Sequence, residues 1–132
     1  VMTMEETIRR LGDAELEIMQ AVWAAGEPVS STYVQQALRG RRDWALGALM
    51  TALGRLCDKG FLRREKQGRN NLYAPLIDER TYQQREGRTI LERLYGNSVT
   101  GLVAALYDGH SISDRDLAEL RRFLEEKEAS HE

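Results

Sequence analysis

DWALGALMTALGRLCDKGFLRREK, residues 43–66, indicates the fold more directly than any other part of the chain. Its first part carries apolar residues at the three- and four-residue spacing of an amphipathic helix. They form one stripe, made of Leu46, Leu49, Met50, Leu53, Leu56 and Cys57. Asp43 is a suitable N-cap, and Gly60 is a natural helix end. The stretch therefore predicts a helix over about residues 44–59, with the stripe facing the core.

The opposite face of this predicted helix carries mostly small side chains. Its members are Trp44, Gly47, Ala48, Thr51, Arg55 and Asp58. A helix that exposes small side chains can approach another surface closely, so we expect this face to be a contact surface.

After Gly60 the pattern changes from helical to extended. Residues 61–66 and 71–76 are two short β-prone runs, and residues 67–70, Gln-Gly-Arg-Asn, suit a hairpin turn between them. Pro75 lacks a backbone N–H group, so it suits an edge strand. The sequence predicts a β-hairpin that is rich in arginine and lysine.

Two further helices are expected before the opening stretch. The first starts near Leu11 with Gly12 as its N-cap, and the second covers about residues 31–38, after a minimal strand at residues 29–30. A polar turn, residues 39–43, leads into the third helix. Helix, short strand, helix, turn, helix and basic hairpin is the order of a winged helix-turn-helix, whose recognition helix enters the DNA major groove.

The net charge of −2 is unevenly distributed along the chain. Residues 39–69 carry nine basic and three acidic side chains, a net charge of +6, whereas residues 78–132 carry −4. Basic clustering of this kind is expected of a protein that binds phosphates. We expect Thr51 and Arg55 to reach base edges, Ala48 to meet a thymine methyl, and the hairpin to contact phosphates. The candidate DNA-binding residues are Arg41, Arg42, Trp44, Gly47, Ala48, Thr51, Arg55, Arg63, Arg64, Lys66 and Arg69.

The region after residue 77 is expected to form three helices, over about residues 78–95, 99–107 and 114–128, with Ser98 and Ser113 as N-caps of the last two. The middle helix is apolar nearly all round, so it needs cover on several sides. A second copy of the chain would supply that cover, although burial inside the same chain is an alternative. The candidate dimer residues are Leu91, Leu94, Tyr95, Val99, Leu102, Val103, Leu106, Leu117, Leu120 and Leu124.

These patterns predict a mainly α-helical protein with a small β-hairpin wing. Residues 1–77 would form the winged-helix DNA-binding domain, and residues 78–132 a helical dimerisation domain. No apolar run is long enough to span a membrane and no apolar signal segment opens the chain, so we expect a cytoplasmic protein. Its single cysteine, Cys57, fits a reducing compartment.

Enzymatic, metal and cofactor chemistry find no support in the sequence. The two histidines, His110 and His131, lie in polar segments without a partner nearby in sequence. Cys57 falls on the apolar stripe, where a cysteine is ordinarily an inert small hydrophobe. The chain has neither a glycine-rich phosphate loop nor a metal-ligand cluster of the usual spacing.

Several segments together resemble the penicillinase-repressor (BlaI/MecI-like) family. They are residues 11–23, the pair Asp43-Trp44, residues 50–56, 59–62 and 71–73, and the region from Ser113 onward. The resemblance implies a homodimer that binds a palindromic operator and represses genes for β-lactam resistance or a related stress response. It also implies a membrane-bound sensor protease as a partner, which inactivates the repressor by cutting its C-terminal region.

Two segments depart from the pattern of this family. Residues 45–48 are Ala-Leu-Gly-Ala, where better-known members carry polar residues, which leaves the operator sequence open. Residues 102–106 lack the asparagine expected at the cleavage site, and the C-terminal region lacks the paired cysteines of copper-responsive members. Two alternatives stay open: a winged-helix protein-interaction module without DNA binding, and a ligand-responsive regulator of another winged-helix family.

Overall fold

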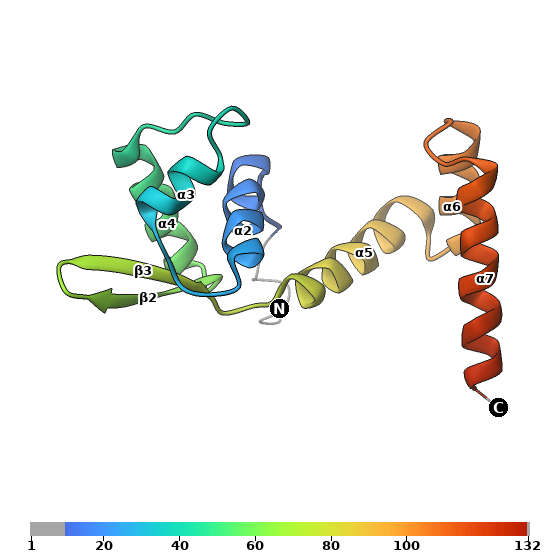
Figure 1. Cartoon of the computed structure of the whole chain (residues 1–132). Helices are drawn as coiled ribbons and strands as arrows, with labels where there is room; N and C mark the ends of the chain where they lie inside the picture. The colour runs from blue at the N-terminus through green and yellow to red at the C-terminus, as the bar shows by residue number, and fades with distance from the viewer. Residues whose placement is uncertain (1–9, 132) are drawn as a thin grey trace. The chain divides into compact units, whose positions relative to one another are not determined.

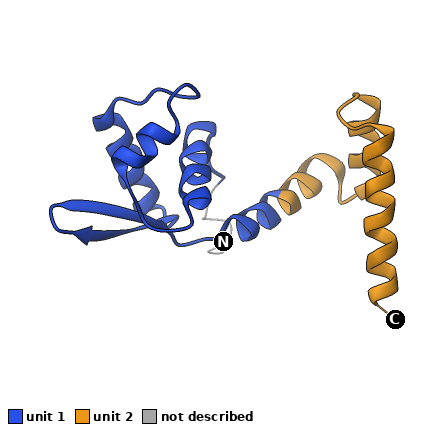
Figure 2. Cartoon of the chain, viewed as in Figure 1, with its two compact units in different colours: residues 1–86 blue, residues 87–132 orange. Residues whose placement is uncertain are grey.

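The computed structural model describes residues 10–131, and the first residues, on which the expectation of no signal segment rests, lie outside them. Its elements divide into two compact units, residues 1–86 and 87–132 (Figure 2). The division falls inside the helix α5 (Glu79–Tyr95), nine residues after the boundary expected from the sequence. The assignment of DNA binding to one unit and dimerisation to the other stays a prediction.

The first unit has the element order of a winged helix (Figure 1). Its helices are α2 (Asp13–Ala25), α3 (Ser31–Ala37), α4 (Leu46–Asp58) and the first part of α5, and its strands are β1 (Val29–Ser30), β2 (Leu62–Gln67) and β3 (Asn70–Pro75). The second helix of the helix-turn-helix is α4, and the β2–β3 hairpin is the wing. The mainly helical winged-helix fold expected from the sequence is confirmed.

The three strands form one antiparallel sheet in the order β1-β3-β2. In the hairpin Gln67 pairs with Asn70, and Gly68 adopts a positive φ of 63°, which glycine accommodates readily. The expectation that Pro75 lies on an edge strand is wrong, because β3 is the central strand.

Pro75 is tolerated there because β1 is only two residues long. It pairs with Leu72 and Tyr73 and does not reach Pro75. Leu76 donates its N–H to the carbonyl of Phe61 at 2.8 Å, on the β2 side. Backbone N–H groups of neighbouring residues point to opposite sides of a strand, so the nitrogen of Pro75 faces the side without a partner.

The core of the first unit lies between its helices and the sheet. α2 contributes Ile18, Met19 and Val22, and α4 contributes Leu49, Leu53 and Leu56. They pack with Leu11, Val29, Val34, Leu38, Phe61, Leu62, Tyr73 and Tyr82. The predicted stripe of α4 is therefore only partly correct, because Leu46 and Met50 are 40% and 45% exposed.

The helix boundaries follow the predicted capping residues with one exception. Gly12 is the N-cap of α2, where its N–H donates to Glu15 at 3.3 Å, and Ser98 and Ser113 cap the last two helices. The prediction for Asp43 is wrong. α4 begins after Ala45 without a side-chain cap, and Asp43 instead accepts the N–H of Gly40 at 2.8 Å, which closes the preceding loop.

The second unit consists of the end of α5 together with α6 (Val99–Asp108) and α7 (Asp114–Ser130). Neither α6 nor α7 contains a buried residue. The helices thus lack the closed core of the first unit. Within residues 10–131, no helix is both long and apolar enough to cross a membrane.

Candidate nucleic-acid interface

The outer face of α4 carries the candidates that the sequence placed there. Gly47, Ala48, Thr51 and Arg55 are all exposed. A Cβ atom added at Gly47 would meet nothing within 4 Å, so the helix surface is open at this point. The hydroxyl of Thr51 donates to the carbonyl of Gly47 at 3.1 Å, one turn earlier in the same helix.

Leu46 and Met50 also belong to this outer face, which the sequence pattern did not predict. Both belong to the helical apolar stripe, and periodicity alone assigned them to the core. Met50 lies about 100° around the helix from the buried Leu49, so the two side chains face different surroundings. The width of the apolar stripe could have indicated this exposure, because the stripe is wider than the face of one helix that packs against a core.

Trp44 differs from the other candidates because its side chain packs against the core. Its carbonyl accepts a hydrogen bond from Nε2 of Gln35 at 3.0 Å, and a hollow of about 320 Å³ lies beside it, lined also by Arg39 and Asp43. The indole N–H is buried and finds no hydrogen-bond partner among the described residues. This geometry makes Trp44 an anchor of the loop before α4, and its contact with DNA stays a prediction.

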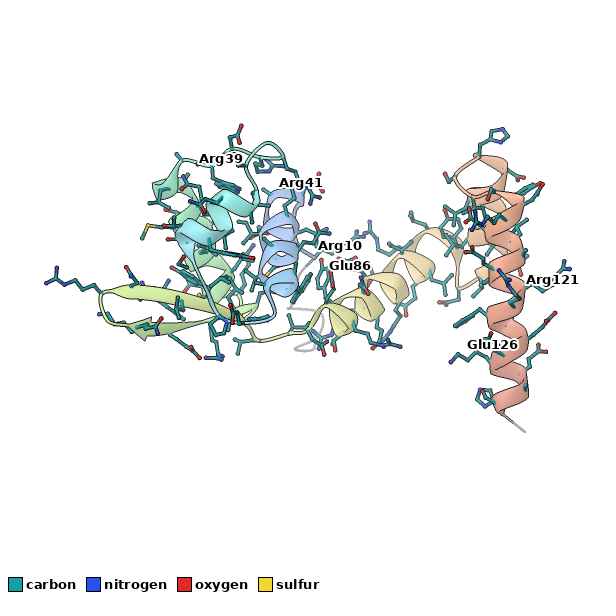
Figure 3. The ribbon with its side chains drawn as sticks, viewed as in Figure 1. Arg10, Arg39, Arg41, Glu86, Arg121 and Glu126 are labelled. Carbon is teal, nitrogen blue, oxygen red and sulfur yellow. The ribbon has the colours of Figure 1, made fainter. Side chains whose placement is uncertain are left out.

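The loop between α3 and α4 carries exposed arginines, and Figure 3 labels Arg39 and Arg41 there. Arg42, in contrast, donates from Nε to Glu17 of α2 at 3.0 Å, with a second bond of 3.3 Å from Nη2. The hydrogen bond from Arg42 lowers the pKa of Glu17, and the same bond raises the pKa of Arg42. Arg42 is therefore held against α2. Arg41 forms no ion pair within the described residues.

A second ion pair joins α2 to the end of α4. Nζ of Lys59 lies 2.7 Å from Oε2 of Glu15. Partial burial alone would raise the pKa of Glu15, but the hydrogen bonds from Lys59 and from the N–H of Gly12, with the nearby positive charges, lower it overall. Together with Arg42–Glu17, this pair fastens α2 to the segments on either side of the recognition helix.

The wing supplies Arg63, Arg64, Lys66 and Arg69, all exposed. Arg63 forms an ion pair with Glu65 on the same strand. The guanidinium of Arg64 lies 5.7 Å from the centroid of the Tyr73 ring, and a Cβ atom on Gly54 would be 3.5 Å from Nη2 of Arg64. Arg64 therefore lies between the wing and α4.

Some cations on this side of the first unit are not neutralised. Lys66 and Arg69 take part in no ion pair within residues 10–131, and the same holds for Arg41 and Arg55. They belong to the loop, the recognition helix and the wing, which are the three elements that contact DNA in a winged helix. The arrangement suits a polyanion with a groove wide enough for α4.

The candidate dimer residues are at least partly exposed in the single chain. Leu94, Val99 and Leu124 are 68%, 61% and 51% exposed, and the remaining candidates, Leu91, Tyr95, Leu102, Val103, Leu106, Leu117 and Leu120, are half-buried. Tyr107 and Phe123, which are not among the predicted dimer residues, are 42% and 52% exposed. The hydroxyl of Tyr107 donates to Asp114 at 2.9 Å, and this hydrogen bond raises the pKa of Tyr107.

The residues weighed for enzymatic chemistry occupy ordinary positions. His110 and His131 are exposed, and Cys57 is half-buried. Burial raises the pKa of the Cys57 thiol, which disfavours the reactive thiolate. Among the described residues, no group of three or more His, Cys, Asp or Glu side chains could hold a metal ion.

Comparison with known proteins agrees with this geometry. The profile of the penicillinase repressor family matches residues 11–126. The penicillinase repressor of Bacillus licheniformis is 31% identical over 119 residues, which cover 90% of this chain and 92% of the relative. Methicillin resistance regulatory protein MecI of Mammaliicoccus sciuri is 24% identical over 124 residues, covering 94% of this chain and 100% of the relative.

Among solved structures, the solution structure of monomeric BlaI of Bacillus licheniformis in complex with the blaP half-operator is 36% identical, with a TM-score of 0.48. It covers 57% of this chain and 90% of that one. The family assigned to the sequence is confirmed by the profile match over most of the chain. Its members are repressors of transcription and not enzymes. The chain belongs to the penicillinase repressor family and is a winged-helix, DNA-binding transcriptional repressor.

Proposed function

We propose that the protein represses transcription as a homodimer on a palindromic operator, with α4 in the major groove and the β2–β3 wing along the phosphate backbone. One observation supports the placement: α4 has an exposed face of small side chains, and the helix and its neighbouring elements carry cations that form no ion pair within residues 10–131. Arg55 stands on the helix itself, Arg41 on the preceding loop, and Lys66 and Arg69 on the wing. Small side chains permit close approach to the groove, and the cations replace counterions on the phosphates.

The homodimer is proposed from the second unit. α6 and α7 contain no buried residue, yet they carry leucines, Val99 and Phe123 that expose much of their apolar surface. A second copy would cover this surface, and two-fold symmetry would match a palindrome of two half-sites about 34–36 Å apart. In this proposal residues 1–77 bind DNA and residues 78–132 form the dimer.

The regulated genes are proposed from the names of the relatives. They are a penicillinase repressor and a methicillin resistance regulator, which points to β-lactam resistance or a related stress response. A cytoplasmic location and a membrane-bound sensor protease as partner belong to the same proposal. The segment Leu102–Leu106, where such a protease would cut, lies in α6, where it is helical and partly exposed.

Selection of bound sequences from a random duplex pool tests DNA binding and yields the operator in the same experiment. The expected product is an inverted repeat whose half-sites are separated by about one helical turn. The Ala48→Glu variant should select nothing, because it places bulk and negative charge at the point of close approach. Ala129→Glu, at another exposed alanine near the end of α7, is the matched control and should select the same operator.

Two outcomes would contradict the proposal. A protein that enriches no duplex at low salt would favour a protein-interaction module instead. Enrichment of a single, non-repeated site by a protein that sediments as a monomer would leave DNA binding in place and remove the dimer.

A further inference from the structure

The outer face of α4 has almost no polar side-chain atoms with which to read bases. Between residues 45 and 55 the exposed positions are Ala45, Leu46, Gly47, Ala48, Met50, Thr51 and Arg55. Arg55 is the one charged side chain in this set, and Thr51 is the one with a hydroxyl. The remaining side chains are apolar or absent.

The hydroxyl of Thr51 is already engaged. Its single hydrogen is donated to the carbonyl of Gly47 at 3.1 Å, so the side chain has no free donor for a base edge. It retains an acceptor oxygen and an exposed γ-methyl group. The surface that Thr51 presents to a partner is therefore mainly its methyl group, like the apolar surface of its neighbours.

These side chains form two neighbouring rows on the helix. Ala48, Thr51 and Arg55 follow one another at three- and four-residue spacing, and Leu46 and Met50 form the adjacent row. Met50 is 45% exposed and Leu46 is 40% exposed, although both are large apolar side chains. Leaving this much apolar surface in water is unfavourable, so the face fits a partner that is itself partly apolar.

In the major groove, the apolar group at the base edges is the C5-methyl of thymine. Covering the polar edges of other bases with these side chains would remove their water without replacing its hydrogen bonds. We propose that Ala48, Met50 and the γ-methyl of Thr51 read thymine C5-methyl groups in the operator, so that sequence recognition is largely apolar. The inference rests on the proposed placement of α4 in the major groove.

The test replaces thymines of the selected half-site by deoxyuridine, one position at a time. Deoxyuridine lacks the C5-methyl and keeps the Watson–Crick pair and every polar atom of the groove. At two or more adjacent positions we expect the Kd to rise about four-fold for each methyl removed. Deoxyuridine outside the half-site should leave the Kd unchanged.

Two matched variants of Thr51 assign one of these methyls. Thr51→Ser keeps the hydroxyl and removes the methyl, so it should weaken binding about four-fold on the thymine operator and lose its sensitivity to deoxyuridine at one position. Thr51→Val keeps the methyl and should bind within about two-fold of the wild type. Lys66→Ala is the control outside the helix. It should weaken binding equally on the thymine operator and on the deoxyuridine operator.

The possible failures are distinguishable. If no deoxyuridine position matters, or if the half-site contains no thymine where α4 contacts it, apolar readout is overturned while operator binding stands. Loss of binding in Thr51→Val with full binding in Thr51→Ser overturns it as well, because the hydroxyl would then be the reading group. If the protein binds no duplex, the inference falls together with the proposed function.

Discussion

The two compact units differ in where they keep their apolar side chains. In residues 10–86, Ile18, Leu49, Leu53, Leu56 and others of the core are completely shielded from solvent, whereas α6 and α7 have no buried residue. α7 is as amphipathic as the helices of the first unit and α6 is apolar nearly all round, so a lack of apolar side chains does not explain the difference. The first unit closes its core with helices on a sheet, whereas the described residues of the second unit form helices alone.

The N-terminal and C-terminal parts of the chain also differ in net charge. Residues 39–69 carry +6 and residues 78–132 carry −4. The basic stretch of the first unit suits a polyanion, whereas the exposed leucines of the second unit suit an apolar surface. The first unit has a closed core of its own, whereas α6 and α7 have none, and this difference is what the proposed dimer would explain.

The strongest test of this comparison places a charge in the second unit. Leu106→Asp or Leu120→Asp should give a monomer with an intact winged helix, because an unpaired carboxylate buried at an interface costs several kcal/mol. Without tethering to the second half-site, operator affinity should fall by about 10²–10⁴-fold. Sedimentation and an operator titration on the same protein measure both effects.

The control for this test is Ser130→Asp at the exposed end of α7, which should remain dimeric. A Leu106→Asp protein that still sediments as a dimer would show that the apolar surface of the second unit is not the interface. A monomer that binds the full operator like the wild type would show that dimerisation does not serve binding.

The next largest effect is expected in the core of the first unit. Leu53→Ala removes a side chain with no solvent exposure, so the free energy of unfolding should fall by about 2–5 kcal/mol. Leu76 lies in the same unit but is 57% exposed, and Leu76→Ala should change the free energy of unfolding by less than about 0.5 kcal/mol. Urea unfolding followed by circular dichroism measures both. Equal effects of the two substitutions would show that burial does not decide how much a leucine of the first unit contributes to stability.

Tyr82 tests how the first unit holds the start of α5. Its hydroxyl accepts the N–H of Leu11 at 2.9 Å and donates to Glu86 at 2.7 Å, and its ring packs against Trp23 and Phe61. Tyr82→Phe keeps the ring and leaves a buried N–H without its acceptor. The free energy of unfolding should fall by about 1–3 kcal/mol at neutral pH.

The same tyrosine predicts a pH dependence. Burial, with the hydrogen bond to Glu86 and its charge, raises the pKa of Tyr82 from 10.0 to about 12. The unfolded chain therefore loses this proton first, and stability present below pH 10 is lost as the pH rises from about 10 toward 12. Tyr82→Phe should lack this part of the alkaline loss, whereas Tyr33→Phe, at a 47% exposed position, should retain it. If the wild type, Tyr82→Phe and Tyr33→Phe lose stability identically between pH 10 and 12, this alkaline loss does not come from Tyr82.

The smallest expected effect distinguishes the charges of the two units. Lys66→Ala on the wing should weaken binding on every operator and reduce the slope of log K against log salt by about one. Lys127→Ala, in the second unit, should leave the slope unchanged. If single alanine variants of Arg63, Arg64, Lys66 and Arg69 all keep the wild-type slope, the wing does not contact DNA.

Local signals predicted much of the fold correctly. Gly12, Ser98 and Ser113 cap helices as expected, and the hairpin turn lies within the predicted residues 67–70, although Gln67 and Asn70 are already paired and only Gly68 and Arg69 form the turn. Each of these features is encoded within a few residues, where backbone geometry and hydrogen bonding favour one residue type. Their placement needs no knowledge of the rest of the chain.

Features that depend on distant segments were less predictable. Arg42 pairs with Glu17 and Lys59 with Glu15, across 25 and 44 residues of sequence, and neither pair has a local signature. The exposure of Met50 depends on how much of α4 the core covers. The candidate cations were found from composition, but their division into paired and unpaired groups required the structure.

The position of β2 at the edge of the sheet has a consequence for self-association. An edge strand presents unpaired N–H and C=O groups to which a strand of another molecule can add. Here that edge carries Arg63, Arg64 and Lys66, and like charges on two such edges repel each other. The side chains proposed to hold phosphates should therefore also oppose edge-to-edge association of the free protein, and this repulsion should weaken at high ionic strength.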